Sequence, residues 1–149
     1  ICVAPDVGGT ARARALGKLL NVDLAIVDKR RPAPGKSEVM NVIGNVKNKT
    51  CILVDDIIDS GGTIVNAASE LKKRGAKDVH VYVTHGVLSG NAVEKIKKSS
   101  IKNLVVTDTI DNSTKVKKAK NIEVLTISNL VGEAIKRISN STSVSDLFK

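Results

Sequence analysis

Short, uninterrupted apolar runs alternate with segments of helical periodicity along the whole chain, and this alternation limits the possible folds more than any other feature. Strands that are apolar at every position are buried on both faces, which is typical of parallel sheets covered by helices. We therefore expect one α/β domain with a mainly parallel sheet and helices on both faces. The expected strands are residues 1–4, 23–28, 50–54, 79–84, 103–107 and 122–127, with residues 39–46 as a short strand or hairpin. The expected helices are residues 10–20, 63–74, 92–99 and 129–139, followed by a final apolar turn at 144–148.

Residues 54–63 form the most informative motif. Two adjacent carboxylates at a strand end, Asp55 and Asp56, can accept hydrogen bonds from neighbouring hydroxyls such as those of a ribose. The glycines of residues 59–63 let backbone N–H groups converge on a phosphate at a helix N-terminus. The alternative interpretation is that the carboxylates only end a strand and the glycines only turn the chain. The coincidence of two carboxylates, a glycine loop and a helix start favours a sugar-phosphate site.

The charge of the chain indicates anionic partners. Lys and Arg number 24 against 15 Asp and Glu, which gives a net charge of +9. Nucleic acid and phosphorylated small molecules both fit that charge. One Tyr, one Phe and no Trp leave almost nothing on which bases could stack, so we expect no nucleic-acid partner. The lysines between residues 95 and 120 are interpreted as a solvated surface.

Several features bear on the cellular setting of the chain. It contains no signal-peptide pattern and no apolar run near the roughly 20 residues of a membrane span, so we expect a cytoplasmic location and no membrane partner. Cys2 and Cys51 each lie in an apolar run and are interpreted as buried free thiols. His80 and His85 are interpreted as structural, because neither has metal-ligand spacing. The chain begins at Ile1 inside an expected strand, which suggests a fragment of a longer protein.

The motif at residues 54–63 resembles the signature shared by type I phosphoribosyltransferases and the ribose-phosphate diphosphokinases, also called PRPP synthetases, where PRPP is 5-phosphoribosyl 1-diphosphate. A second loop separates these two groups. Residues 28–32, followed by residues 37–41, resemble the catalytic flexible loop of the diphosphokinases. Residues 5–9, 84–90, 105–109 and 143–148 are also similar to that family. By this resemblance, residues 1–149 are the C-terminal domain, which has a type I phosphoribosyltransferase-like fold and binds ribose 5-phosphate, and the N-terminal ATP-binding half is absent.

The resemblance implies a function and a set of site residues. The reaction would transfer the diphosphoryl group of ATP to ribose 5-phosphate, giving PRPP and AMP, with Mg²⁺ as cofactor. The implied catalytic residues are Lys29 and Arg31, and Arg31 would also contact ribose 5-phosphate. Asp55 and Asp56 would bind the ribose hydroxyls, and the 5-phosphate would bind to a loop of Asp59, Ser60, Gly61, Gly62 and Thr63, in which Asp59 shapes the loop. The pyrophosphate loop would consist of Asp6, Val7, Gly8 and Gly9, with Asp6 as a metal ligand.

The tail of the chain allows two interpretations. Ser143, Ser145 and Phe148 match positions that contribute to an allosteric ADP or phosphate site between subunits in regulated members of the family. Alternatively, Leu147 and Phe148 form a buried anchor for the C-terminus.

Other functions remain open alternatives. We expect the full enzyme to be a homo-oligomer, and this chain to be inactive by itself. The main alternative is a non-catalytic module that senses ribose phosphates or PRPP. A phosphoribosyltransferase is disfavoured, because the chain lacks a recognisable base-binding hood and the loop with Lys29 and Arg31 would have no role.

Overall fold

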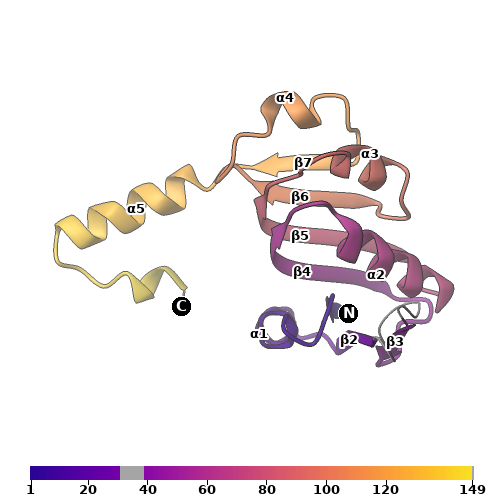
Figure 1. Cartoon of the computed structure of the whole chain (residues 1–149). Helices are drawn as coiled ribbons and strands as arrows, with labels where there is room; N and C mark the ends of the chain where they lie inside the picture. The colour runs from indigo at the N-terminus through magenta and orange to yellow at the C-terminus, as the bar shows by residue number, and fades with distance from the viewer. Residues whose placement is uncertain (31–38, 149) are drawn as a thin grey trace.

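The strands form one twisted sheet, seen here in a computed structural model that describes residues 1–30 and 39–148 (Figure 1). Within those residues the sheet has seven strands in the order β3-β2-β1-β4-β5-β6-β7. Every pair is parallel except β2 with β3, which is antiparallel. The strands are β1 (Cys2–Ala4), β2 (Leu24–Arg30), β3 (Val39–Ile43), β4 (Thr50–Ile58), β5 (Asp78–Gly86), β6 (Asn103–Thr107) and β7 (Ile122–Leu125). The predicted mainly parallel α/β fold is confirmed.

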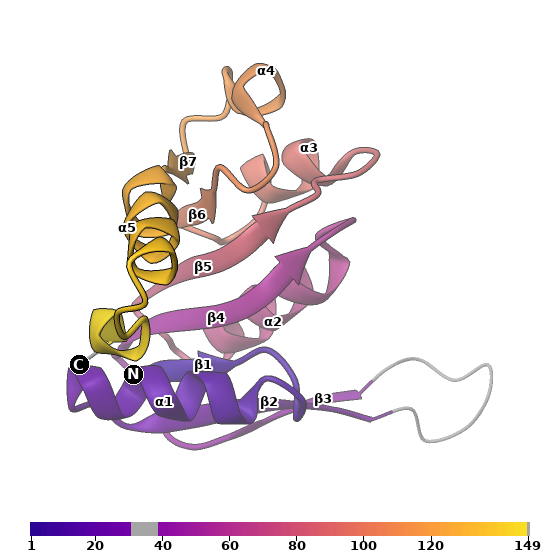
Figure 2. The same cartoon turned by 90° about the vertical axis from the view of Figure 1, so that its left-hand side faces the viewer.

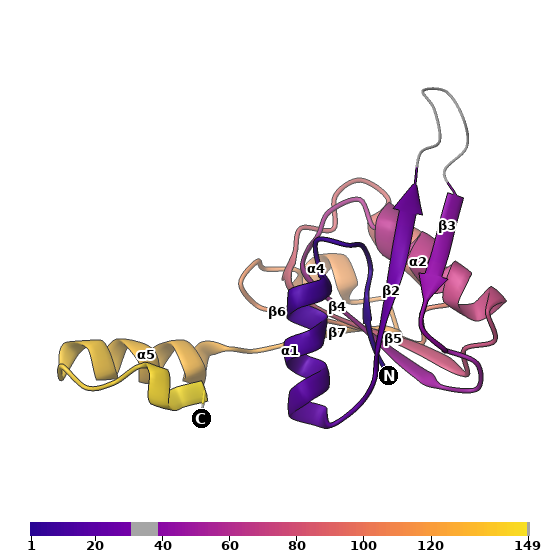
Figure 3. The ribbon, with the colours of Figure 1, turned by 90° about the horizontal axis from the view of Figure 1, so that it is seen from below.

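Helices lie on both faces of the sheet, as predicted, but they cover the two faces unequally. Helix α1 (Thr10–Leu20) packs on one face against β1, β2 and β4, whereas α2 (Gly62–Lys73) and α3 (Ala92–Lys97) lie on the other (Figure 2). A short helix α4 (Ser113–Val116), which the sequence did not predict, precedes β7. Helix α5 (Ser128–Ser139) and the 3-10 helix Ser145–Phe148 extend away from the sheet (Figures 1 and 3).

The main hydrophobic core lies between the sheet and α2. Leu53 and Val81 of the sheet and Leu71 of α2 are fully buried there, and Ile96 of α3 extends the same cluster. On the opposite face α1 buries only Ala13 and Gly17, whose small size lets this helix approach the strands closely. None of the described helices is both long and apolar enough to cross a bilayer.

Beyond α1, part of the second sheet face is uncovered. A groove of ≈ 370 Å³ runs between α1 and β7. Leu19 of α1 is 82% exposed and Leu125 of β7 is 53% exposed at this groove, and Tyr82 of β5 is also exposed. No residue of α5 is buried within the described part of the chain, although four large apolar side chains of this helix are exposed. This open face was not evident from the strand pattern, because fully apolar strands indicate cover on both sides.

Two details of the predicted structure are wrong. The strand predicted at residues 50–54 continues to Ile58, because the parallel pairing with β5 runs on from Asp55 with Val83 to Ile58 with Gly86. Asp55 and Asp56 therefore belong to the strand instead of following it. The predicted buried anchor at the C-terminus is also wrong for Phe148, which is 74% exposed.

The predicted burial of the two thiols is confirmed and leads to a testable expectation. Cys2 and Cys51 are free and fully buried, and burial raises the pKa of each thiol. A raised pKa leaves less of the reactive thiolate at neutral pH. We expect both thiols to react slowly with Ellman's reagent in the folded chain and quickly after unfolding in guanidinium, where the same protein serves as its own control. Rapid reaction of either thiol in the folded chain would contradict this burial.

Candidate functional site

The candidate site lies where β1 stops and its neighbours continue. In the sheet β1 pairs with β2 on one side and β4 on the other, so the order of the strands reverses at β1. β1 ends at Ala4, whereas β4 runs on past Leu53, the partner of Val3, to Ile58. Ligands of open α/β sheets bind at such a reversal, beyond the carboxyl ends of the strands.

The loop that follows β1 is a closed turn. The backbone N–H of Gly9 donates to Oδ1 of Asp6 at 2.8 Å, and the hydroxyl of Thr10 donates to the carbonyl of Val7 at 2.7 Å. A Cβ atom on Gly8 would lie 3.3 Å from the same Asp6 oxygen, so a side chain there would crowd the carboxylate. The predicted pyrophosphate loop is thus an ordered turn with the Asp6 carboxylate at its centre.

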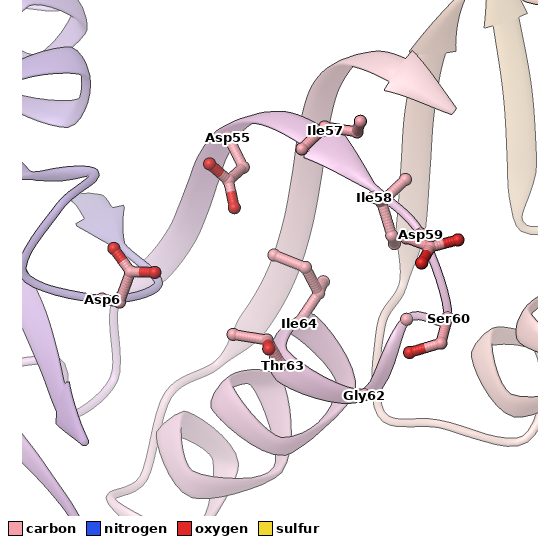
Figure 4. Close-up of a pocket in the computed structure, with 10 residues that line it drawn as sticks. Asp6, Asp55, Ile57, Ile58, Asp59, Ser60, Gly62, Thr63 and Ile64 are labelled. Carbon is pink, nitrogen blue, oxygen red and sulfur yellow. The ribbon is translucent and has the colours of Figure 1, made fainter. Parts of the chain in front are cut away.

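A cavity of ≈ 210 Å³ unites this turn with the motif at residues 54–63 (Figure 4). Asp6 and Asp55 line one side of the cavity, and Thr63 lies on the side formed by the start of α2 (Figure 4). The side chain of Asp59 points away from these two carboxylates (Figure 4). The lining residues are Asp6, Asp55, Ile57, Ile58, Asp59, Ser60, Gly61, Gly62, Thr63 and Ile64.

The glycine loop gives the cavity a helix N-terminus with unused donors. Gly61 adopts a left-handed conformation with φ of 77° and precedes the first residue of α2, Gly62. No side chain caps this helix end and no acidic residue lies in its first turn. The first backbone N–H groups of a helix have no partner within it and carry a partial positive charge. A phosphate group is the kind of ligand that such an end accepts.

The segment after β5 and helix α3 form hydrogen bonds to the end of β4 and to the glycine loop. The backbone N–H of Val87 donates to the carbonyl of Ile58 at 2.9 Å, and that of Ser89 donates to the carbonyl of Asp59 at 3.2 Å. From α3, Nζ of Lys95 donates to the carbonyl of Ser60 at 3.3 Å. These bonds hold the loop without using its N–H groups, and Lys95 adds positive charge at the end of the cavity that the glycine loop forms.

An arginine that the sequence analysis did not single out contacts both carboxylates of the motif. Nη1 of Arg12 lies 2.8 Å from Oδ1 of Asp55, and Nη2 lies 2.8 Å from Oδ2 of Asp56. The Asp55 side chain is 18% exposed and that of Asp56 is 60% exposed. The same oxygen of Asp55 also accepts the backbone N–H of Asp56 at 3.0 Å.

The two carboxyl groups titrate as a pair with opposite shifts. The pKa of Asp55 is raised, chiefly by partial burial and further by the neighbouring Asp56, while Arg12 acts against this rise. For Asp56 desolvation acts to raise the pKa, but the charge of Arg12 and several hydrogen bonds outweigh it, so the pKa is lowered.

The side chains of the cavity fit a magnesium ion that is coordinated mostly by phosphate oxygens and water, with one carboxylate from the protein. Among residues 1–30 and 39–148 no three His, Cys, Asp or Glu side chains gather into a metal cluster. Mg²⁺ is commonly bound through one or two carboxylates together with phosphate oxygens and water. Asp6 offers one such carboxylate in the wall of the cavity, and its Oδ2 is outside the hydrogen bond to Gly9.

The remaining predicted residues lie in different places. Lys29 is partly buried near the carboxyl end of β2, whereas Arg31 lies outside the described residues. Ser143, Ser145 and Phe148 are exposed at the end of the chain beyond α5, away from the sheet (Figure 3). His85 is not among the residues that line the cavity, and its Nδ1 lies 2.9 Å from the hydroxyl of Thr109.

Comparison with known proteins gives a consistent family. Residues 10–149 match the family described as the phosphoribosyl synthetase-associated domain. The ribose-phosphate pyrophosphokinase of Hyphomonas neptunium is 62% identical over 149 residues, which are 99% of this chain and 48% of that protein. The enzyme of the same name from Bradyrhizobium diazoefficiens is 60% identical over 146 residues, 98% of this chain and 46% of that protein. The chain therefore spans about half the length of these curated relatives.

Solved structures agree with the fold. The phosphoribosylpyrophosphate synthetase of Mycobacterium smegmatis aligns with a TM-score of 0.85 and 37% identity, over 94% of this chain and 45% of that one. An adenine phosphoribosyl transferase of Trypanosoma brucei, solved with AMP, pyrophosphate and ribose-5-phosphate, aligns with a TM-score of 0.55 over 84% of this chain and 54% of that one. At 17% identity the second similarity shows a shared fold only.

Proposed function

Since this chain belongs to the phosphoribosyl synthetase-associated domain family, we propose that it is the C-terminal, ribose 5-phosphate-binding half of a ribose-phosphate pyrophosphokinase. The observation that carries this proposal is that Asp6, Asp55 and the glycine loop before α2 line the same cavity. It combines carboxylate acceptors for hydroxyl groups with a helix N-terminus for a phosphate, which are the two halves of a sugar phosphate.

The proposed roles follow the chemistry of each group. Asp55 and Asp56 accept hydrogen bonds from adjacent ribose hydroxyls, and the backbone N–H groups of Gly62 and Thr63 bind the 5-phosphate. Ser60 and Thr63 add hydroxyl donors to that loop, and Asp59 shapes it. Val7, Gly8 and Gly9 form the turn that presents the Asp6 carboxylate, which would hold Mg²⁺ together with phosphate oxygens of the substrates.

In the proposed reaction the anomeric oxygen of ribose 5-phosphate forms a bond to the β-phosphorus of ATP. The bond between that phosphorus and the oxygen of the α-phosphate breaks, AMP leaves, and PRPP is formed. No protein nucleophile is needed, so the protein contributes orientation and positive charge. Lys29 and Arg31 would supply that charge to the transferring group, and bound Mg²⁺ would neutralise the phosphate oxygens further.

Several features support assigning this chain to one half of a larger enzyme. The relatives are about twice as long, and the uncovered sheet face beside α1 is largely apolar. Contiguous exposed apolar surface marks contact sites, so we propose that the second half of the protein covers this face. We expect no activity from residues 1–149 by themselves. Homo-oligomer formation, the tail residues as an allosteric site and a cytoplasmic location remain expectations for the whole enzyme.

Calorimetric titration with ribose 5-phosphate tests the binding role. We expect binding by the unaltered chain and a loss of ~10–100-fold in affinity for Asp55→Asn, because a hydrogen bond to a charged group is worth about 1.5–3 kcal/mol. Asp23→Asn, at an exposed carboxylate paired with Lys49 at the opposite edge of the sheet, is the matched control and should bind normally. The pKa of Asp55 is raised, so on acidification the affinity for ribose 5-phosphate should begin to fall at a higher pH than the titration of an ordinary aspartate would give. Absence of binding by the unaltered chain would contradict the proposal.

A reconstitution experiment tests the catalytic role. The part of the Hyphomonas neptunium relative that lies outside the match can be produced separately and mixed with this chain. We expect ATP-dependent release of AMP from the mixture in the presence of ribose 5-phosphate, and none from either part alone. If a well-folded mixture released no AMP, the chain would be better described as a binding module.

A further inference from the structure

Arg12 of α1 contacts two adjacent carboxylates of β4, of which Asp55 lines the cavity. Its two terminal nitrogens bind one oxygen of Asp55 and one oxygen of Asp56, each at 2.8 Å. A guanidinium group is planar and its N–H directions are fixed, so two simultaneous contacts set the orientation of both carboxylates. Each carboxylate keeps its second oxygen, Oδ2 of Asp55 and Oδ1 of Asp56, outside the ion pair.

The position of Arg12 is itself well defined. It lies in the first turns of α1, directly after the Asp6 turn, and the next residue, Ala13, is fully buried against the sheet. A Cβ atom on Gly9 would lie 3.8 Å from Nη1 of Arg12, so the arginine passes close to that turn. The guanidinium thus reaches the carboxylates from a helix that is packed on the neighbouring strand β1.

Without a cation at this point the carboxylates would repel each other. Asp55 and Asp56 are adjacent in sequence, and Asp6 and Asp59 add negative charge around the cavity that Asp55 lines. Like charges at close range in a partly buried site disfavour a common orientation. Arg12 offsets this repulsion and holds the pair in one arrangement.

We propose that Arg12 is a positioning residue of the ribose-binding site, which holds Asp55 and Asp56 so that their second oxygens accept hydrogen bonds from two adjacent ribose hydroxyls. This inference rests on the proposed binding of ribose 5-phosphate. It assigns hydroxyl recognition to three residues, although only two of them touch the sugar. It also predicts that Arg12 affects recognition of the hydroxyls while leaving the contribution of the phosphate intact.

A selectivity measurement tests this assignment. Ribose 5-phosphate and 2-deoxyribose 5-phosphate differ by one of the two adjacent hydroxyls and share the same phosphate. We expect the unaltered chain to bind ribose 5-phosphate at least ~10-fold more tightly than 2-deoxyribose 5-phosphate. The deoxy sugar lacks one hydroxyl and so loses a hydrogen bond to a charged carboxylate. In Arg12→Ala this preference should fall to ~3-fold or less, since the carboxylates are no longer held together. Arg12→Lys, which keeps the charge without the two-pronged geometry, should restore part of the preference.

The controls separate positioning from general stability. Arg14 lies two residues further along α1, is exposed and faces a surface hollow with Lys18 and Asn21, so Arg14→Ala should keep the full preference. Melting temperatures identify any variant that fails to fold, and Arg12→Gln then replaces Arg12→Ala. A folded Arg12 variant that keeps the preference, or that binds ribose 5-phosphate more tightly, overturns the assignment while the proposed function stands. An unaltered chain that binds neither sugar, or both equally, overturns the proposed function, and the role of Arg12 with it.

Discussion

Replacing Gly61 with Val should reduce the affinity of the chain for ribose 5-phosphate by ~100-fold or more, because two charge-assisted hydrogen bonds at about 1.5–3 kcal/mol each would be lost. Gly61 has a φ of 77° and is buried at the start of α2. A β-branched residue is strongly disfavoured in this left-handed region. Relaxing Val to an allowed conformation would turn the N–H groups of Gly62 and Thr63 away from the cavity.

Gly90 provides the matched control for this change. Its φ is 55°, so Val there suffers a similar backbone strain of about 1–2 kcal/mol. A Cβ atom on Gly90 would meet nothing within 4 Å, and Gly90 does not line the cavity. Both variants should lower the melting temperature, but only Gly61→Val should weaken the binding of ribose 5-phosphate in calorimetry. Equal affinities for the two variants would show that the glycine loop does not bind the phosphate.

Replacing Lys29 with Ala should slow the reconstituted enzyme by ~10²–10³-fold in kcat, the effect typical of removing a donor that stabilises transition-state charge. Lys29 lies three residues beyond Ile26, the residue of β2 that pairs with the last residue of β1, Ala4. Strand alternation places Lys29 on the same face as Val27 of the main core, and Asp55 on the same face as Leu53. Lys29 and Asp55 therefore flank the space beyond the end of β1 from the two neighbouring strands.

The kinetic pattern distinguishes catalysis from binding. Because Lys29 is proposed to act on the transferring group, the KM for ribose 5-phosphate should change little. Lys18→Ala, at an exposed lysine in the last turn of α1, should leave kcat unaltered. Normal turnover by Lys29→Ala would remove this residue from the catalytic machinery and favour the alternative of a module that senses ribose phosphates.

The sheet and the glycine loop were predictable because their signals are local. Apolar runs record burial along each strand, and they identified the parallel sheet correctly. Helical spacing did not identify the buried face of α1, which consists of Ala13 and Gly17, while Leu19 is 82% exposed. Residues 59–63 were identified as a loop at a helix start because Gly61 permits a backbone conformation that other residues avoid. The end of β4 was placed too early because Asp55 and Asp56 interrupt the apolar run, although backbone pairing with β5 continues through them.

Other features of the site depend on residues that are distant in the sequence. Arg12 and Arg14 are equivalent basic residues of one alanine-rich helix, and only the packing of α1 on β1 directs Arg12 toward Asp55 and Asp56. Asp6 and Asp55 line one cavity because β1 ends early relative to β4. The uncovered face beside α1 could not be predicted from the strands. An apolar strand has the same sequence pattern whether a helix of its own chain or another domain covers it. Residue-level chemistry and periodicity thus determined the fold class and the glycine loop at the start of α2, whereas strand lengths and helix packing decided which side chains share the cavity.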